Sequence, residues 1–513
     1  MEYAEVEVTG NFTTAARARL MLLLPIVLLM WSALAQSTHL EVLVPSEFPD
    51  LSTCNTVSGD QNMVKYHVYS RLYTFDDNMQ PQPDLVTSEQ ISDDATVWTL
   101  TIREGVKFHD GSPLTAESIK FTIDHMRDSE CEQQVLYAPI QEVRVESDTR
   151  ITLVTAEPFL ALRNNLAHPD AAILSPSAIE ELGDDHGLNP VGSGPYEFQQ
   201  WVTGDHITLT RNDDYYGGAP FFEVIDFRFV TDATTRALLV ESGDADVALR
   251  VLPTDANRMA ENEQLEVTKI NSRNIIFPMN VTDGPFSNHN ARLAANHAVD
   301  KETIVDRVLF GAGVPSQSLV ETVAGTVPVG FYDYDPDLAR SLLEESGYDG
   351  APVTLLSPVG RYPQDSEVAQ AVAGYLREVG FDVDLNSISD WPSYVSAVEA
   401  GEFGLFMLGW SGSTGDPDNA FRRTLSTPFA GRLWNPGGYS NPEADALLDE
   451  AGAKIDVDAR NALYAEFQRI VWNDAPWLFM YRQSVFVVHD EAIKGITILS
   501  GTEAPLFWTA TRE

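Results

Sequence analysis

The second half of the chain alternates short apolar runs with helical spacing, and this rhythm restricts the fold more than any other feature. Residues 353–357 and 405–408 are short apolar runs, and apolar residues alternate with acids across 381–385, as strands require. Between these runs, residues 368–379 and 390–400 place apolar side chains at the spacing of a helix face. This order predicts an α/β lobe with a doubly wound sheet of parallel strands.

Capping residues support these elements, and similar signals occur in the first half of the chain. Gly380 is placed to end the first helix, and Asp390 is placed to begin the second. Thr115 predicts the start of a further helix, and residues 151–155 predict a strand. Apolar alternation interrupted by a Glu-Gly turn predicts a β-hairpin over residues 98–108.

The loops that leave the three predicted parallel strands form the candidate ligand site. Ligands of open parallel sheets bind outside the carboxyl ends of the strands. Arg361 follows the first strand, Trp391 follows the second, and the segment 410–418 follows the third. A fixed cation, flat aromatic rings and hydroxyl groups are suited to recognition of a small solute. The candidate substrate-binding residues are Arg361, Trp391, Trp410, Ser411, Ser413, Thr414 and Asp416.

The N-terminus has the parts of a cleavable export signal. A positive segment that includes Arg17 precedes the uncharged run 20–34, and small residues follow up to Ala35. A membrane anchor is the alternative, but the run is shorter than the roughly 20 apolar residues that span a bilayer, and it contains Pro25. We therefore predict a signal peptide over residues 1–35, cleavage near Ala35 and a periplasmic mature protein.

The composition limits the surface chemistry of the chain. Its 513 residues include Asp+Glu 76 against Lys+Arg 33, a formal net charge of −43. A surface this negative repels nucleic-acid phosphates and anionic lipid head groups, which excludes nucleic-acid binding through a broad basic face. Adaptation to a saline habitat explains the acidity, and so does the solubility of an ordinary secreted protein.

The chain contains no motif of a common catalytic or metal site. It has no H-E-x-x-H and no S-x-x-K, residues 409–413 miss the last glycine of G-x-S-x-G, and residues 311–316 miss the third glycine of a dinucleotide loop. Cys54 and Cys131 are the only cysteines, so they either form one disulfide or stay reduced. We predict a binding protein rather than an enzyme, with no catalytic residue, no metal ligand and no cofactor.

A series of short motifs recurs in order from about Leu40 to Val488. The matching stretches are residues 69–73, 83–85, 98–111, 192–196, 211–216, 243–246, 298–301, 339–347, 409–410, 416–417 and 439–442, followed by the helix from Arg460. Together they resemble the family 5 extracellular solute-binding proteins. The resemblance implies the periplasmic component of an ABC importer for peptides or, in some members, for nickel, haem or oligosaccharides.

The resemblance also implies an architecture. The fold would be α/β and periplasmic binding protein type II-like, with two lobes, an interdomain cleft and an extra subdomain, as in the large peptide binders. The implied divisions are the signal peptide at 1–35, a discontinuous lobe I at 36–75, 190–283 and 483–513, its extra subdomain at 76–189, and the α/β lobe II at 284–482.

Several cleft positions gain a specific meaning from the resemblance. Arg361 resembles the arginine that holds the ligand carboxylate in dipeptide-binding members, and a guanidinium matches a carboxylate with two parallel hydrogen bonds. Ser413 stands where peptide binders commonly carry an aspartate for the peptide α-ammonium, so this departure counts against free dipeptides as ligands. Asp416 belongs to a separate Asp-Pro motif, where a structural cap is the alternative role. Trp391 and Trp410 either stack on the ligand or fill the core.

The predicted function is capture of a peptide or peptide-like, carboxylate-bearing solute in the interlobe cleft, followed by delivery to the permease. The predicted partners are a small-molecule or short-peptide ligand and the ABC permease and ATPase complex in the inner membrane. We expect a monomer that binds no nucleic acid. An opine, an oligosaccharide or a metal chelate is the alternative ligand within the same class. A secreted hydrolase or a chemosensory binding module is the alternative from another class.

Overall fold

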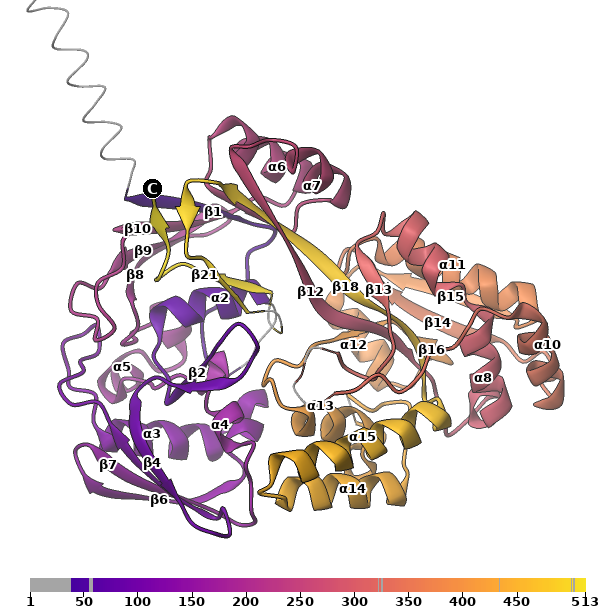
Figure 1. Ribbon diagram of the computed structural model, residues 1–513, viewed down its shortest axis with the longest axis horizontal. Coiled ribbons are helices and arrows are strands. Elements are labelled where there is room, and N and C mark those ends of the chain that lie inside the picture. The colour runs from indigo at the N-terminus through magenta and orange to yellow at the C-terminus, as the bar shows by residue number, and fades with distance from the viewer. Residues whose placement is uncertain are drawn as a thin grey trace, which may run out of the picture.

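A computed structural model gives the arrangement of the chain (Figure 1). It describes residues 38–54, 59–321, 323, 326–432, 434–499, 501 and 503–513. The predicted signal peptide, residues 1–35, lies outside these described residues. Within them, no helix combines the length and the apolar character that crossing a membrane requires.

The largest sheet runs through the middle of the molecule. Its strands are β1 (His39–Val44), β8 (Tyr196–Val202), β9 (His206–Arg211), β10 (Val224–Phe229), β11 (Val247–Leu249), β12 (Leu265–Pro278), β13 (Gly313–Pro315), β17 (Leu408–Trp410) and β18 (Trp477–Asp490). They follow the order β17-β12-β18-β11-β1-β10-β9-β8, and β13 pairs with β18 beside this path. β1 is parallel to both of its neighbours, whereas β12 and β18 are antiparallel to each other.

The long strands β12 and β18 join the two sides of the molecule. They pair from Leu265 opposite Asp490 to Pro278 opposite Trp477. Figure 1 shows them crossing from the indigo and magenta side to the orange side. The division expected between residues 482 and 483 falls inside β18, so this strand belongs to both sides. The set of domain boundaries stays a prediction.

The predicted α/β lobe is present. Its elements are β14 (Val353–Pro358), α11 (Asp365–Val379), β15 (Val383–Ile388), α12 (Trp391–Glu399) and β16 (Leu405–Phe406). β14 lies between β15 and β16, and both pairings are parallel. Gly380 ends α11 with a φ of 115°, a conformation that favours glycine, and the Asp390 carboxylate accepts a hydrogen bond from the Ser393 N–H at 3.0 Å. Both predicted helix boundaries are therefore confirmed.

A four-stranded antiparallel sheet forms part of the other side. It consists of β4 (Val86–Ile91), β5 (Val97–Ile102), β7 (Arg150–Thr155) and β6 (Ile140–Ser147) in that order, with α3 (Ala116–Arg127) beside it. The strand prediction at 151–155 and the helix start at Thr115 are confirmed.

The predicted hairpin over residues 98–108 is wrong. β5 pairs with β4 and β7, and of the segment 106–108 only Lys107 makes a bridge, to Pro113. The apolar alternation correctly marked the buried face of β5, but burial does not identify which strand lies alongside. That choice depends on contacts with residues far away in the sequence.

The other elements connect these layers. The remaining helices are α2 (Gly59–Val68), α4 (Leu162–Asn165), α5 (Pro176–Leu182), α6 (Ala233–Ser242), α7 (Pro253–Met259), α8 (His289–Ala298), α9 (Lys301–Thr303), α10 (Pro336–Glu345), α13 (Pro417–Leu425), α14 (Pro442–Ala453) and α15 (Val457–Asp474). Short 3-10 or π turns are η1 (Glu132–Leu136), η2 (Pro169–Ala171), η3 (Gly183–Gly187), η4 (Pro285–Ser287), η5 (Ile304–Val308) and η6 (Thr427–Phe429). Two-stranded pairs are β2 (Tyr73–Phe75) with β3 (Pro81–Pro83), β19 (Ile493–Lys494) with β22 (Thr511–Arg512), and β20 (Thr497–Leu499) with β21 (Ala504–Leu506).

The buried apolar side chains gather in separate clusters. One cluster contains Leu40 and Trp98 and joins the large sheet to the four-stranded sheet. A second contains Leu355 and packs the α/β sheet against β12 and β18. A third contains Phe421 and Phe467 and lies under α13 and α15.

Three buried histidines make the fold sensitive to acid. Burial lowers the pKa of His67, His109 and His168 from 6.5 to about 4. In the unfolded chain the same groups take up protons near pH 6.5, so the unfolded state binds more protons between pH 6.5 and 4. The folded state therefore loses stability as the pH falls through this window.

We expect the free energy of unfolding to decrease by up to about 3 kcal/mol for each of these histidines between pH 6.5 and pH 4. Urea unfolding at a series of pH values measures it. The series is run in about 1 M KCl, so that screening suppresses the changing repulsion among surface acids. A free energy that stays level across this range would contradict the prediction.

Candidate ligand-binding site

A pocket of about 170 Å³ lies where the loops of the α/β lobe meet the other side of the molecule. From the α/β side it is lined by Arg361, Trp391, Trp410, Ser411, Ser413 and Thr414, which are all the predicted site residues except Asp416. From the other side it is lined by Gly59, Asn62, Gln133, Leu136 and His168. The parallel topology therefore brings the predicted loops to one edge, facing α2 and η1.

Local hydrogen bonds fix the loop that carries Arg361. The Asp365 carboxylate at the start of α11 accepts bonds from the backbone N–H groups of Gly360, Arg361 and Tyr362, at 3.0, 2.7 and 3.0 Å. The guanidinium carbon of Arg361 lies 4.6 Å from the centre of the Trp391 ring, within cation–π range. Arg361 is exposed and lines the pocket, on a loop whose position these contacts set.

The electrostatic surroundings of Arg361 favour an anion. The neighbouring protein atoms lower the pKa of Arg361, and the positive charges of Arg273 and Arg250 lower it further, against an opposing effect of Tyr362. The guanidinium stays protonated at neutral pH, because its ordinary pKa of 12.5 is far above that range. A carboxylate entering the pocket would meet the positive charge of Arg361.

Trp410 contributes a hydrogen-bond donor to the pocket. It ends β17, which pairs with β12 opposite Asn274. The side chain is only 9% exposed, and the indole Nε1 has no hydrogen-bond partner among the described residues. Its ring packs edge-on to Trp434 at a centroid distance of 5.2 Å. The indole N–H is therefore a buried donor without a partner among the described residues, on a side chain that lines the pocket.

The structure places Asp416 outside the pocket. Its carboxylate accepts hydrogen bonds from Arg460 at 2.7 and 2.8 Å and from the backbone N–H of Asp418 at 2.9 Å, at the first turn of α13. Both side chains of the Asp416–Arg460 pair are almost fully buried. The role of a structural cap, which the sequence left as the alternative, accounts for these contacts, and we leave Asp416 out of the candidate site.

Contacts across the pocket hold its two sides together. Arg423 of α13 forms an ion pair with Glu132 of η1 at 3.3 Å. The side-chain amide of Asn164 donates a hydrogen bond to the carbonyl of Thr414 at 2.9 Å.

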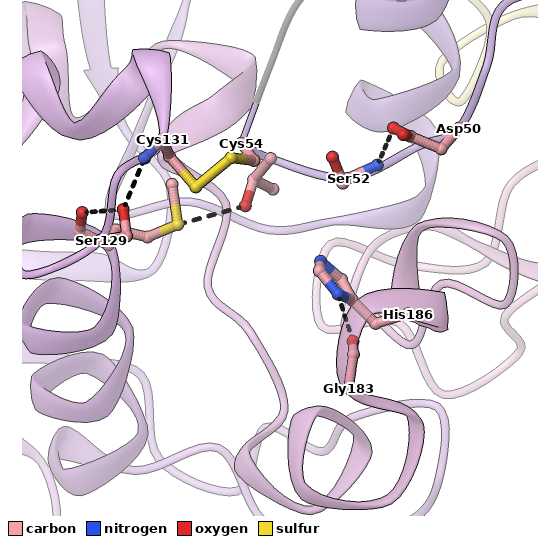
Figure 2. The surroundings of a disulfide bond; sticks show 9 residues. Asp50, Ser52, Cys54, Ser129, Cys131, Gly183 and His186 are labelled. Carbon is pink, nitrogen blue, oxygen red and sulfur yellow. Dashed lines mark hydrogen bonds between the residues drawn. A yellow bond between two sulfur atoms is a disulfide. The ribbon is translucent and has the colours of Figure 1, made fainter.

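A disulfide fixes the pocket wall opposite Arg361. Figure 2 shows the bond between Cys54 and Cys131, which links the stretch before α2 to the start of η1. The backbone N–H of Gln133 also donates to the carbonyl of Cys54 at 3.2 Å. Because Gln133 and Leu136 line the pocket, the disulfide restrains that wall. The sequence left the state of these cysteines open, and the structure pairs them.

Sequence reasoning missed the pocket residues that come from distant segments. Arg273 lies in β12, Arg423 in α13 and Gln133 in η1. Each has the sequence signal of an ordinary polar surface residue, so no local pattern could have selected them. Within the described residues, no group of His, Cys, Asp and Glu side chains is arranged to hold a metal ion.

Comparison with known proteins gives one sequence family and one fold. The sequence model for bacterial extracellular solute-binding proteins, family 5 Middle, matches residues 80–432. The glutathione-binding protein GsiB of Pectobacterium atrosepticum is 31% identical over 477 residues, which cover 90% of this chain and 92% of the relative.

Two solved structures illustrate the fold match. The ABC transporter-associated periplasmic binding protein DppA from Helicobacter pylori, in complex with the peptide STSA, is 23% identical and has a TM-score of 0.82 over 93% of this chain and 98% of that one. AgaA from A. tumefaciens, in complex with agropinic acid, is 23% identical and has a TM-score of 0.82 over 93% of this chain and 99% of that one. The predicted α/β architecture of the large peptide binders is thereby confirmed.

Proposed function

Because the chain belongs to the bacterial extracellular solute-binding proteins of family 5, the substrate-binding components of ABC importers, we propose that it captures a peptide-like, carboxylate-bearing solute in the pocket around Arg361. Proteins of this family bind solutes and are not enzymes. We place the solute contacts on Arg361, Trp391, Trp410, Ser411, Ser413 and Thr414. We also propose that residues 1–35 direct export to the periplasm, where the loaded protein meets the permease and ATPase complex.

The observation that carries this proposal is the placement of Arg361. Its guanidinium stands on the Trp391 ring, on a loop held by Asp365, at the carboxyl edge of a parallel sheet. A guanidinium fixed in this way binds a carboxylate through two parallel hydrogen bonds. The relatives named as glutathione-binding proteins add support, because glutathione is a peptide with two carboxylates.

Delivery follows from a change in the balance between open and closed forms. A solute that contacts both sides of the pocket binds the closed form more tightly, so its arrival increases the closed population. The Arg423–Glu132 ion pair and the Asn164–Thr414 hydrogen bond favour the same form. The permease would then recognise the closed protein.

The Arg361→Ala variant is expected to bind carboxylate solutes at least tenfold more weakly, a loss of about 1.4 kcal/mol or more, because it removes both hydrogen bonds and the charge. Titration calorimetry with glutathione and with butyryl-alanine measures the affinities. Arg307→Ala is the matched control, because Arg307 is 80% exposed and its ion pair is with Asp306. An unchanged affinity in Arg361→Ala, or a wild-type protein that binds neither probe, would contradict the proposed function.

A further inference from the structure

The charged side chains that line the pocket are all of one sign. They are Arg273, Arg361 and Arg423, and no Asp or Glu stands among the lining residues in the part of the chain that the structure describes. This is the reverse of the whole chain, in which Asp+Glu 76 outnumber Lys+Arg 33. His168 also lines the pocket, and its ring nitrogen Nδ1 accepts a hydrogen bond from the Asp170 N–H. Because this nitrogen carries no proton, the ring is neutral.

The acids behind the wall at Arg273 are already bound to arginines. Glu503 accepts from Arg273 at 3.0 Å and from Arg250 at 3.2 Å. Although burial opposes ionisation of Glu503, these two cations lower its pKa to about 2. Asp60 accepts from Arg250 at 2.9 Å and is 1% exposed. Neither carboxylate can reach a solute without giving up a charge-assisted hydrogen bond to an arginine, which costs free energy.

The acids on the other walls are engaged as well. Asp416 is bound to Arg460, Asp365 accepts the backbone N–H groups of the Arg361 loop, and Glu132 is paired with Arg423. An ammonium group on a solute would therefore enter a site with arginines and find no lining carboxylate. It would lose its hydration without gaining an ion pair, which costs binding free energy.

Two further polar groups lie in the wall of the pocket. The Trp410 N–H is buried without a partner within the described chain, and the Asn419 side-chain amide, which can donate or accept a hydrogen bond, also lines the pocket. The first turn of α2, which includes Gly59, adds the partial positive charge of a helix N-terminus. Donors and positive potential together favour acceptor-rich, negatively charged solutes.

We propose that the pocket selects carboxylates whose amine is acylated or otherwise uncharged, such as N-acyl amino acids and N-blocked peptides, over solutes with a free ammonium. This inference rests on the proposed function, because it assumes that a carboxylate binds at Arg361. It also implies that glutathione, which carries a free α-ammonium beside its two carboxylates, binds this chain more weakly than butyryl-alanine does. It adds that the opposite end of the solute is neutral or anionic.

Three solutes of similar length test the proposal by calorimetry. They are 4-aminobutyryl-alanine, butyryl-alanine and succinyl-alanine, whose far ends are cationic, neutral and anionic. We expect butyryl-alanine to bind about tenfold or more tightly than 4-aminobutyryl-alanine, and succinyl-alanine to bind at least as tightly as butyryl-alanine. Equal affinities for the cationic and neutral solutes, or a preference for the cationic one, would overturn the proposal.

Asn419→Asp provides a test that changes charge without changing size. Asn419 is in the first turn of α13, where an acid is compatible with the helix. The variant should bind 4-aminobutyryl-alanine about tenfold more tightly than wild type and succinyl-alanine more weakly. Asn189→Asp, at an exposed position outside the pocket, should change neither affinity.

The two proposals fail in different ways. If the solutes bind in the wrong order of charge but Arg361→Ala still weakens them, only the charge selectivity is wrong. If wild type binds none of the three, or if Arg361→Ala leaves every affinity unchanged, the carboxylate site itself is wrong, and the selectivity falls with it.

Discussion

The Asp416→Ala variant is expected to lose about 3–5 kcal/mol of the free energy of unfolding. The substitution removes the carboxylate that accepts hydrogen bonds from Arg460 at 2.7 and 2.8 Å. Arg460 is 8% exposed, so its guanidinium would remain buried without a counter-ion. The start of α13 would also lose the cap that Asp416 provides to the Asp418 N–H.

Urea unfolding of Asp416→Ala measures this loss, and the double variant Asp416→Ala/Arg460→Met is its control. Methionine fills much of the same space without a charge, so the double variant should be more stable than Asp416→Ala alone. Calorimetry on the folded protein completes the test: the affinity for butyryl-alanine should stay close to that of wild type. If Asp416→Ala unfolds with the same free energy as wild type but no longer binds butyryl-alanine, Asp416 belongs to the binding site and the structural role is wrong.

The Cys54→Ser/Cys131→Ser variant is expected to lose about 4 kcal/mol of stability. The disulfide joins residues 77 positions apart, and a crosslink over so long a loop greatly restricts the unfolded chain. The variant should also bind solute more weakly, because η1 would no longer be tied to the stretch before α2 and the wall at Gln133 and Leu136 would be less restrained.

Unfolding with and without a reductant separates the disulfide from the substitutions themselves. Reductant should lower the unfolding midpoint of the wild-type protein towards that of the double serine variant. It should leave the variant unchanged, since the variant contains no cysteine. A wild-type midpoint that does not respond to full reduction would show that the crosslink contributes little.

The part of the site that could be predicted from sequence came from chain topology. Arg361 and Trp391 follow two parallel strands of one sheet, which send their outgoing loops to the same edge. Trp410 comes shortly after the third parallel strand, β16, and ends β17 of the large sheet. The elements themselves were visible because helix and strand spacing, Gly380 and Asp390 act within a few residues. Such local interactions are similar whatever the rest of the chain does.

The parts that could not be predicted depend on contacts between distant segments. Lys107 bridges Pro113 instead of continuing a hairpin, because β5 is flanked by β4 and β7. From the sequence, Asp416 was a candidate ligand-binding acid. In the fold its carboxylate accepts a hydrogen bond from Arg460, 44 positions away in the chain. Gln133 reaches the pocket because η1 lies against the stretch before α2, to which the disulfide ties it.

The sequence by itself determined the class of molecule: an acidic chain with a parallel α/β lobe, the motifs of a solute-binding family and a candidate cation at Arg361. These features depend only on amino-acid composition, on the spacing of apolar residues and on capping residues within a few positions of each helix end. Only the tertiary structure decided the charge of the pocket. In the fold, the surrounding acids accept hydrogen bonds from arginines or from backbone N–H groups. The charged residues that remain among the pocket lining are arginines. In a chain of net charge −43, the local potential is set by which charges are paired, and pairing is a property of the fold.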